Sequence, residues 1–103
     1  MMSILVVFTA KLREGVEERY RALSKEVLEQ ALQQPGLIFL DRGRSVMQER
    51  GIISVSEWAS EEALEAWRDH PVHRRAQELA LKELFESHIL KKASIDNKPT
   101  KKI

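Results

Sequence analysis

Both tryptophans of the chain and two of its three histidines lie in one stretch, EWASEEALEAWRDHPVHRRAQ, which covers residues 57–77. Trp58 or Trp67 could wall a pocket for a flat ligand, since an indole ring offers a large apolar surface. His73 could accept a proton, because an unperturbed imidazole titrates near neutral pH. Gln77, four residues later, could hold a carbonyl or phenol oxygen. The alternative is that both tryptophans are core residues packed between a sheet and a helix, which is the commoner role of this residue type.

A metal site is the second chemistry to consider, because His70 and His73 are three residues apart. Pro71 lies between them and is well placed as the first residue of a helix, so His70 is expected to precede that helix. No nearby carboxylate completes a set of metal ligands, and the chain contains no cysteine. We therefore expect no metal site, and surface or cap positions are the commoner roles for such histidines.

The length and charge of the chain narrow the classes of protein to consider. A chain of 103 residues is expected to form one domain. Its 17 basic and 16 acidic side chains give a net charge of +1, which offers no general attraction for nucleic acid. No stretch approaches the roughly 20 apolar residues of a membrane helix, and the first apolar run is too short for a signal peptide. We therefore expect a cytoplasmic protein without a membrane partner, and the lack of cysteine fits a reducing compartment.

The first half of the chain shows a strand pattern, a helical pattern and then two further strands. Residues 4–12 are apolar at every second position, which predicts a strand with one buried face. Apolar residues then recur at helical spacing over residues 16–32, and the Pro-Gly pair at 35–36 ends this helix. Residues 37–46 and 52–58 are typical of strands, and the short turn between them predicts a hairpin whose glycine takes a positive φ.

The second half predicts a broken helix followed by a last strand. Ser60 can cap a short helix, and Pro71 then begins a second helix that continues to residue 84. Residues 87–95 could form a fourth strand. Residues 96–103 are polar and basic and are expected to form a tail.

The resulting order, β-α-β-β-α-β with a broken second helix, is that of a ferredoxin-like α+β fold with an antiparallel sheet. This domain is predicted to cover residues 1–95. The helices should cover one face of the sheet, and the other face is partly apolar. A patch of that kind is usually a partner surface, so we expect a homodimer.

The arrangement SEWASEEALEAWRDHPVHRRAQ, in which the two tryptophans lie on either side of SEEA and H-x-x-A-Q follows, resembles the antibiotic biosynthesis monooxygenase family. The resemblance covers residue 3 to about residue 92. It implies a homodimer in which two sheets close into a shared α+β barrel. It also implies several activities: oxidation of small aromatic, quinol or polyketide-like compounds by O2 without metal or flavin, haem degradation, and isomerisation or processing of quinone-like signals. Many members of the family have no assigned substrate.

Individual residues of this sequence favour some of these activities over others. The haem-degrading branch is similar in using an asparagine on the first strand, a tryptophan ending the third strand and a histidine on the last helix. Trp58 matches the tryptophan, but Phe8 falls at the asparagine position and Gln77 at the histidine position. Haem degradation is therefore disfavoured, although His73, one turn earlier, could substitute as an iron ligand.

A cofactor-independent oxygenase has fewer structural requirements, namely a dry pocket, a hydrogen-bond partner and a base. In this interpretation Trp58 and His73 are the catalytic residues. Phe8, Tyr20, Trp67 and Gln77 bind the small aromatic substrate, and no cofactor is needed. A non-catalytic dimeric module that binds a small ligand on the same scaffold is the alternative, and a filled gap between the tryptophans and the first helix would favour it.

Overall fold

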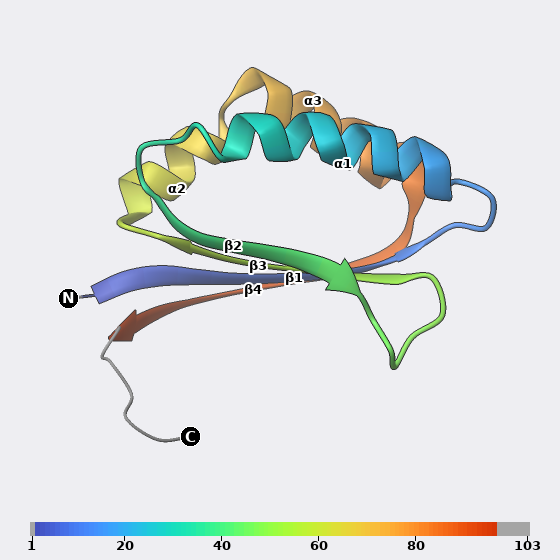
Figure 1. Cartoon of the computed structure of the whole chain (residues 1–103), viewed down its shortest axis with the longest axis horizontal. Coiled ribbons are helices and arrows are strands. Elements are labelled where there is room, and N and C mark those ends of the chain that lie inside the picture. Colours follow the sequence, from blue (N-terminus) through green and yellow to red (C-terminus); the bar gives the residue numbers. More distant parts are fainter. Residues whose placement is uncertain (1, 97–103) are drawn as a thin grey trace.

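The computed structural model describes residues 2–96, which form a four-stranded sheet with helices on one face (Figure 1). The predicted β-α-β-β-α-β order is confirmed, including the break in the second helical region. β4 ends at Asp96, and the rest of the predicted tail, residues 97–103, lies outside the described residues. The elements are β1 (Met2–Leu12), α1 (Glu17–Ala31), β2 (Leu37–Arg44), β3 (Gly51–Trp58), α2 (Glu61–Arg68), α3 (Pro71–Leu79), the π-helical turn η1 (Ala80–Leu84) and β4 (Phe85–Asp96).

The sheet has the order β2-β3-β1-β4, and every neighbouring pair is antiparallel. The predicted β2–β3 hairpin is present, and β1 lies between β3 and β4. Ile4 pairs with Trp58 of β3 and with Ser94 of β4, so these three residues share one face. Because side chains alternate along a strand, this register decides which residues face the helices.

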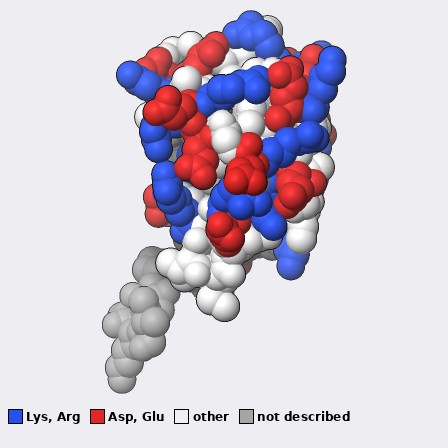
Figure 2. All heavy atoms as spheres, turned by 90° about the vertical axis from the view of Figure 1, so that its right-hand side faces the viewer, with Lys and Arg blue, Asp and Glu red and all other residues white. Residues whose placement is uncertain are grey.

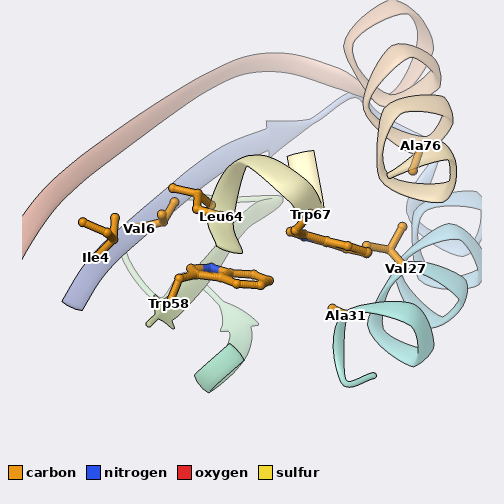
Figure 3. Packing of buried hydrophobic residues seen from close by; sticks show 8 residues of the cluster. All are labelled: Ile4, Val6, Val27, Ala31, Trp58, Leu64, Trp67 and Ala76. Carbon is orange, nitrogen blue, oxygen red and sulfur yellow. The ribbon is translucent and has the colours of Figure 1, made fainter. Parts of the chain in front are cut away.

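The covered face of the sheet and the helices enclose the hydrophobic core. Two clusters of buried residues share it, one at each end of the sheet. The first cluster contains Ile4, Val6, Val27, Ala31, Trp58, Leu64, Trp67 and Ala76, and Figure 3 shows it between sheet and helices. The second contains Ala10, Leu12, Ile52, Ala80, Leu84 and Phe85.

Local hydrogen bonds explain where the broken helix begins again. The Ser60 side chain accepts a hydrogen bond from the Ala63 backbone N–H at 3.1 Å and caps α2. His70 caps α3, since its Nδ1 accepts from the Val72 N–H at 3.2 Å, and Pro71 is the first helical residue. The α-helical geometry ends at Leu79, earlier than predicted, because the chain continues to β4 through a wider π-helical turn.

The hairpin turn differs from the prediction in its details. β2 ends at Arg44, not at residue 46, and the positive φ belongs to Arg50 (57°), not to Gly51. Glycine is still needed at 51, because an added Cβ would lie 2.9 Å from the Gln48 carbonyl oxygen. Arg50 is held in this conformation by donating from Nε to the Leu12 carbonyl oxygen at 3.1 Å.

The bare face of the sheet points away from the helices. The register places Val7 beside Val55, and Thr9 between Ile53 and Ile89, on this face. Phe39 and Ile89 are 49% and 59% exposed, so large apolar side chains lie in solvent there. By contrast, positive and negative side chains are interspersed on the side of the molecule shown in Figure 2, without a broad patch of one sign. None of the helices within residues 2–96 has the length and apolar character needed to cross a membrane.

Candidate functional site

A cavity of about 270 Å³ lies between the covered face of the sheet and the helices. Side chains from β1, α1, β2, β3, α2, α3 and β4 line it, so it draws on nearly the whole fold. The structure brings all the residues predicted for the site to this one cavity. They are Trp58 and His73, predicted as catalytic, and Phe8, Tyr20, Trp67 and Gln77, predicted as substrate-binding.

The two tryptophans form the most enclosed part of the lining. Trp58 is 2% exposed and Trp67 is 6% exposed, and their rings stack with centroids 6.3 Å apart at an angle of 19°. Figure 3 shows both rings between the sheet and α1, directed towards Val27 and Ala31. The Trp58 Nε1–H donates to Ser56 Oγ at 3.0 Å. The tryptophans are therefore core residues that also line the cavity, and their role in ligand binding stays a prediction.

His73 lies beside this wall, with its ring centroid 5.1 Å from that of Trp67. Its Nδ1 is buried without a hydrogen-bond partner. Burial lowers the pKa of His73, and the Arg68 backbone raises the pKa but does not reverse this. The charges of Arg68, Arg42 and His70 lower the pKa further. His73 is therefore neutral at pH 7 and able to accept a proton.

Phe8 and Tyr20 occupy the other end of the cavity with Phe85. The Phe8 ring lies 5.6 Å from that of Phe85 and 6.1 Å from that of His88, and Tyr20 lies 6.1 Å from Phe85. Gln77 also lines the cavity, but it is an exposed residue, which places it at the edge. The cavity thus has aromatic walls at both ends.

Sequence reasoning missed Arg42, which enters the cavity from β2. Its Nη1 donates to Ser24 Oγ at 2.6 Å and to the Ser24 carbonyl oxygen at 3.1 Å, while its Nε is buried without a partner. Burial lowers the pKa of Arg42, and the nearby Tyr20 raises it. The available signal was alternation, because Arg42 is two residues from Leu40, which packs against the core.

Ser54 and Ser56 were missed as well, and both line the cavity from β3. They pair with Phe8 and Val6 of β1, which places them on the covered face. Small side chains at these positions leave room between sheet and helices, and their hydroxyls can hydrogen-bond a ligand. Ser56 already accepts a hydrogen bond from Trp58, and the hydroxyl of Ser54 can bind a substrate oxygen.

A metal centre finds no support in the part of the chain that the structure describes. Within residues 2–96, no three His, Asp or Glu side chains come together in a way that could hold a metal ion. His70 uses its Nδ1 to cap α3, as the position of Pro71 suggested. The cavity can therefore offer aromatic stacking, hydrogen bonds, a neutral imidazole and a buried guanidinium.

Comparison with known proteins places this geometry in a family. The family model described as antibiotic biosynthesis monooxygenase matches residues 3–79. The uncharacterized protein YqjZ of Bacillus subtilis (strain 168) is 30% identical over 91 residues, which cover 88% of this chain and 77% of that protein.

Solved structures share the fold at lower sequence identity. Rv0793 from Mycobacterium tuberculosis superposes with a TM-score of 0.84 at 14% identity, over 95% of this chain and 99% of that one. SO0527 from Shewanella oneidensis gives a TM-score of 0.84 at 17% identity, over 91% of each chain. A structure described as an antibiotic biosynthesis monooxygenase gives 0.79 at 16% identity, over 93% and 99%. Because the family match spans most of the chain and the fold agrees, the protein belongs to the antibiotic biosynthesis monooxygenase family.

Proposed function

We propose that this protein is a monooxygenase that needs no cofactor and oxidises a small aromatic or quinol-like compound with O2. The observation that carries the proposal is His73, a half-buried imidazole with a lowered pKa and a buried, unpartnered Nδ1, in an aromatic-lined cavity. A perturbed titratable group in such a pocket is the usual mark of a reaction site. A filled gap between the tryptophans and α1 would have favoured the non-catalytic alternative, whereas a cavity is present there.

The reaction begins with a phenol whose hydroxyl proton passes to His73. The resulting phenolate is electron-rich and gives one electron to O2, and the two radicals combine to form a carbon–oxygen bond. The peroxide anion then takes the proton back from His73 to give a hydroperoxide. The hydroperoxide then loses water to leave a carbonyl group. For 1-naphthol the balance is naphthol plus O2 to naphthoquinone plus water, so one oxygen atom enters the product. The aromatic walls favour this course because they limit the access of water to the anion.

The size of the cavity limits the substrate. An apolar cavity of about 150 Å³ holds one benzene ring. A cavity of about 270 Å³ therefore suits a compound of about two fused rings. Stacking against the tryptophan wall would orient such rings, with the hydroxyl group towards His73.

The test is oxygen uptake with 1-naphthol and with anthrone, measured above the uncatalysed rate, and 18O2 labelling of the product. His73→Gln should lower kcat about 100-fold, since a positioned base contributes roughly that much or more. His88→Gln is the matched control, because His88 also lines the cavity but is exposed and comes from the start of β4. Unchanged turnover in His73→Gln, or the same loss in His88→Gln, contradicts the assignment of the base.

Haem degradation is not proposed, because the residues do not fit that cofactor. Phe8 offers no hydrogen-bond donor, and the amide of Gln77 is a poor iron ligand. The cavity of about 270 Å³ is also smaller than the range of roughly 300–1,000 Å³ typical of sites for drug-sized ligands. A Soret shift on titration with haemin that is lost in His73→Gln would reverse this conclusion.

We further propose that two copies associate through the bare face of the sheet. Val7 and Val55 are half-buried there, and Phe39 and Ile89 are largely exposed. Apolar surface of this extent on a short chain is stabilised when a second copy covers it. A stable monomer at micromolar concentration in light scattering would contradict the dimer without affecting the proposed chemistry.

A further inference from the structure

The charged residues that line the cavity are all basic. Arg42, Arg68 and Lys92 line it, together with His73 and His88, but none of the lining residues is Asp or Glu. Lys92 is neutralised by Glu61 on α2, with Nζ 2.9 Å from Oε1. Among residues 2–96, no carboxylate pairs with the guanidinium of Arg42. The cavity therefore holds a cation whose counter-charge the described chain does not supply.

The guanidinium of Arg42 is fixed in position. Ser24 on α1 accepts both hydrogen bonds of Nη1, at 2.6 Å from its hydroxyl and 3.1 Å from its carbonyl oxygen. The buried Nε has no partner, and the hydrogen bonds to Ser24 leave Nη2 free. A planar guanidinium with Nε and Nη2 unused presents the edge that binds a carboxylate through two parallel hydrogen bonds. Burying such a charge without a partner is unfavourable, so an anion bound here would offset that cost.

The position of Arg42 also predicts how a ligand would be oriented in the cavity. Tyr20, Ser24 and Arg42 line both this cavity and a second, wider hollow beside the β2–β3 hairpin. That hollow is also lined by four further basic residues and by two acidic ones, Glu17 and Glu49, so the approach to Arg42 carries an excess of positive charge. Trp58 and Trp67 belong to the opposite, apolar cluster. A ligand with one charged end would therefore place that end at Arg42 and its rings against the tryptophans.

We propose that the cavity selects aromatic carboxylates and that Arg42 is the residue that binds the carboxylate. This inference deepens the proposed function and rests on it for the identity of the cavity as the substrate site. The substrate class becomes an aromatic acid of about two fused rings that also carries an oxidisable hydroxyl group. Arg42 acts in binding and orientation, and His73 remains the base.

The test compares two probes that differ in charge and hardly in shape, 2-naphthoate and 2-naphthamide, by isothermal titration calorimetry. Neither probe carries a phenol, so the measurement does not depend on turnover. The wild-type protein should bind 2-naphthoate about tenfold or more tightly than 2-naphthamide, as expected for charge-assisted hydrogen bonds. The preference should weaken as salt is added, because the entrance is open to ions.

Variants then show which residue produces the preference for 2-naphthoate over 2-naphthamide. Arg42→Gln should abolish it and leave the affinity for 2-naphthamide unchanged, and Arg42→Lys should keep part of it. Arg44→Gln is the matched control, because Arg44 is two residues along the same strand and lines only the wider hollow. If Arg42→Gln does not fold, Ser24→Ala replaces it as the test, since it removes one of the two hydrogen bonds that hold Nη1 and should reduce the preference severalfold.

The proposal is overturned if wild-type protein binds both probes equally, or binds neither at millimolar concentration. It is also overturned if Arg42→Gln keeps the preference, or if Arg44→Gln loses it. Failure of the proposed oxygenase is a separate result, namely no oxygen uptake with 1-naphthol or 1-hydroxy-2-naphthoate. A protein that prefers 2-naphthoate but consumes no oxygen would retain the anion site and lose the oxygenase assignment.

Discussion

The two faces of the sheet consist of the same strands but carry different kinds of side chain. On the covered face, β3 contributes Ser54 and Ser56 to the floor of the cavity. On the bare face the same strand carries Ile53 and Val55. In the middle of β3, between Ile52 and Trp58, the side that the helices leave uncovered is therefore the more apolar one. A face that holds a ligand needs room and hydrogen-bonding groups, whereas a face that packs against another sheet needs branched apolar side chains.

This comparison separates two roles that one sheet can perform. The core of the covered face is completed by the two tryptophans, which come from the end of β3 and from α2. No helix covers the bare face, and in our proposal a second copy of the chain covers it. Substitutions on the covered face should therefore change stability and ligand binding, and substitutions on the bare face should change association.

The largest expected effect is on the covered face. Trp58→Ala should lower the free energy of unfolding by about 3–5 kcal/mol, because it leaves a cavity against Trp67 in the best-packed part of the core. Urea denaturation followed by circular dichroism measures this loss. Trp58→Phe keeps a ring against Trp67 and should recover most of the stability. A loss below about 1 kcal/mol in Trp58→Ala would show that the wall is not part of the structural core.

The next effect concerns the bare face. Ile89→Glu places a charge where we expect a second copy to pack, and it should weaken association about 100-fold, which corresponds to about 2.7 kcal/mol. Sedimentation equilibrium measures the dissociation constant. Leu90→Glu is the matched control, because Leu90 is the next residue, is 50% exposed and lines the cavity on the covered face. Equal weakening by both variants would show that the two faces are not separate.

The loop before β2 offers a smaller effect on the covered side. A Cβ added at Gly36 would lie 2.2 Å from the Ala63 Cβ of α2, too close for any real contact. Gly36→Ala should therefore displace α2 from the sheet and lower the free energy of unfolding by about 1–3 kcal/mol. Gly43→Ala is the control, since its added Cβ meets nothing within 4 Å. Thermal unfolding of both variants measures the difference, and equal melting temperatures would contradict the close contact.

The fold was predictable because its signals are local. The period-two pattern of residues 4–12 and the Ser60 cap act within a few residues, and both were confirmed. Pro71 likewise set the start of α3, with His70 as its cap. The end of the hairpin turn was not predictable in detail. Arg50 takes its positive φ while its side chain is hydrogen-bonded to the carbonyl oxygen of Leu12, which is distant in sequence.

The site was only half predictable for the same reason. The residues around the two tryptophans stand out by type and spacing, so their cavity could be anticipated. Arg42 does not stand out in LIFLDRGRSV, because its direction depends on the pairing of β2 with β3, where it lies opposite Ser54. Its bond partner Ser24 lies 18 residues earlier, on α1. Alternation with Leu40 could place Arg42 on the covered face, but its hydrogen bonds to α1 depend on the packing of separate elements and leave no pattern in one segment.

The smallest effect is the pH dependence of stability that His73 contributes. Because the pKa of His73 is lowered from 6.5 by burial and by the charges of Arg68, Arg42 and His70, the folded protein resists protonation of this ring. Above pH 6.5 the ring is neutral in both states, so this contribution is constant there. As the pH falls below that value the unfolded chain takes up the proton first, and the free energy of unfolding decreases until the folded pKa is reached. His73→Gln should remove this part of the decrease, as measured by urea denaturation between pH 7.5 and 5, whereas the exposed neighbour variant Arg74→Gln should keep it. A steeper decrease in His73→Gln than in the wild type would mean that the ring is charged in the folded protein and cannot be the base.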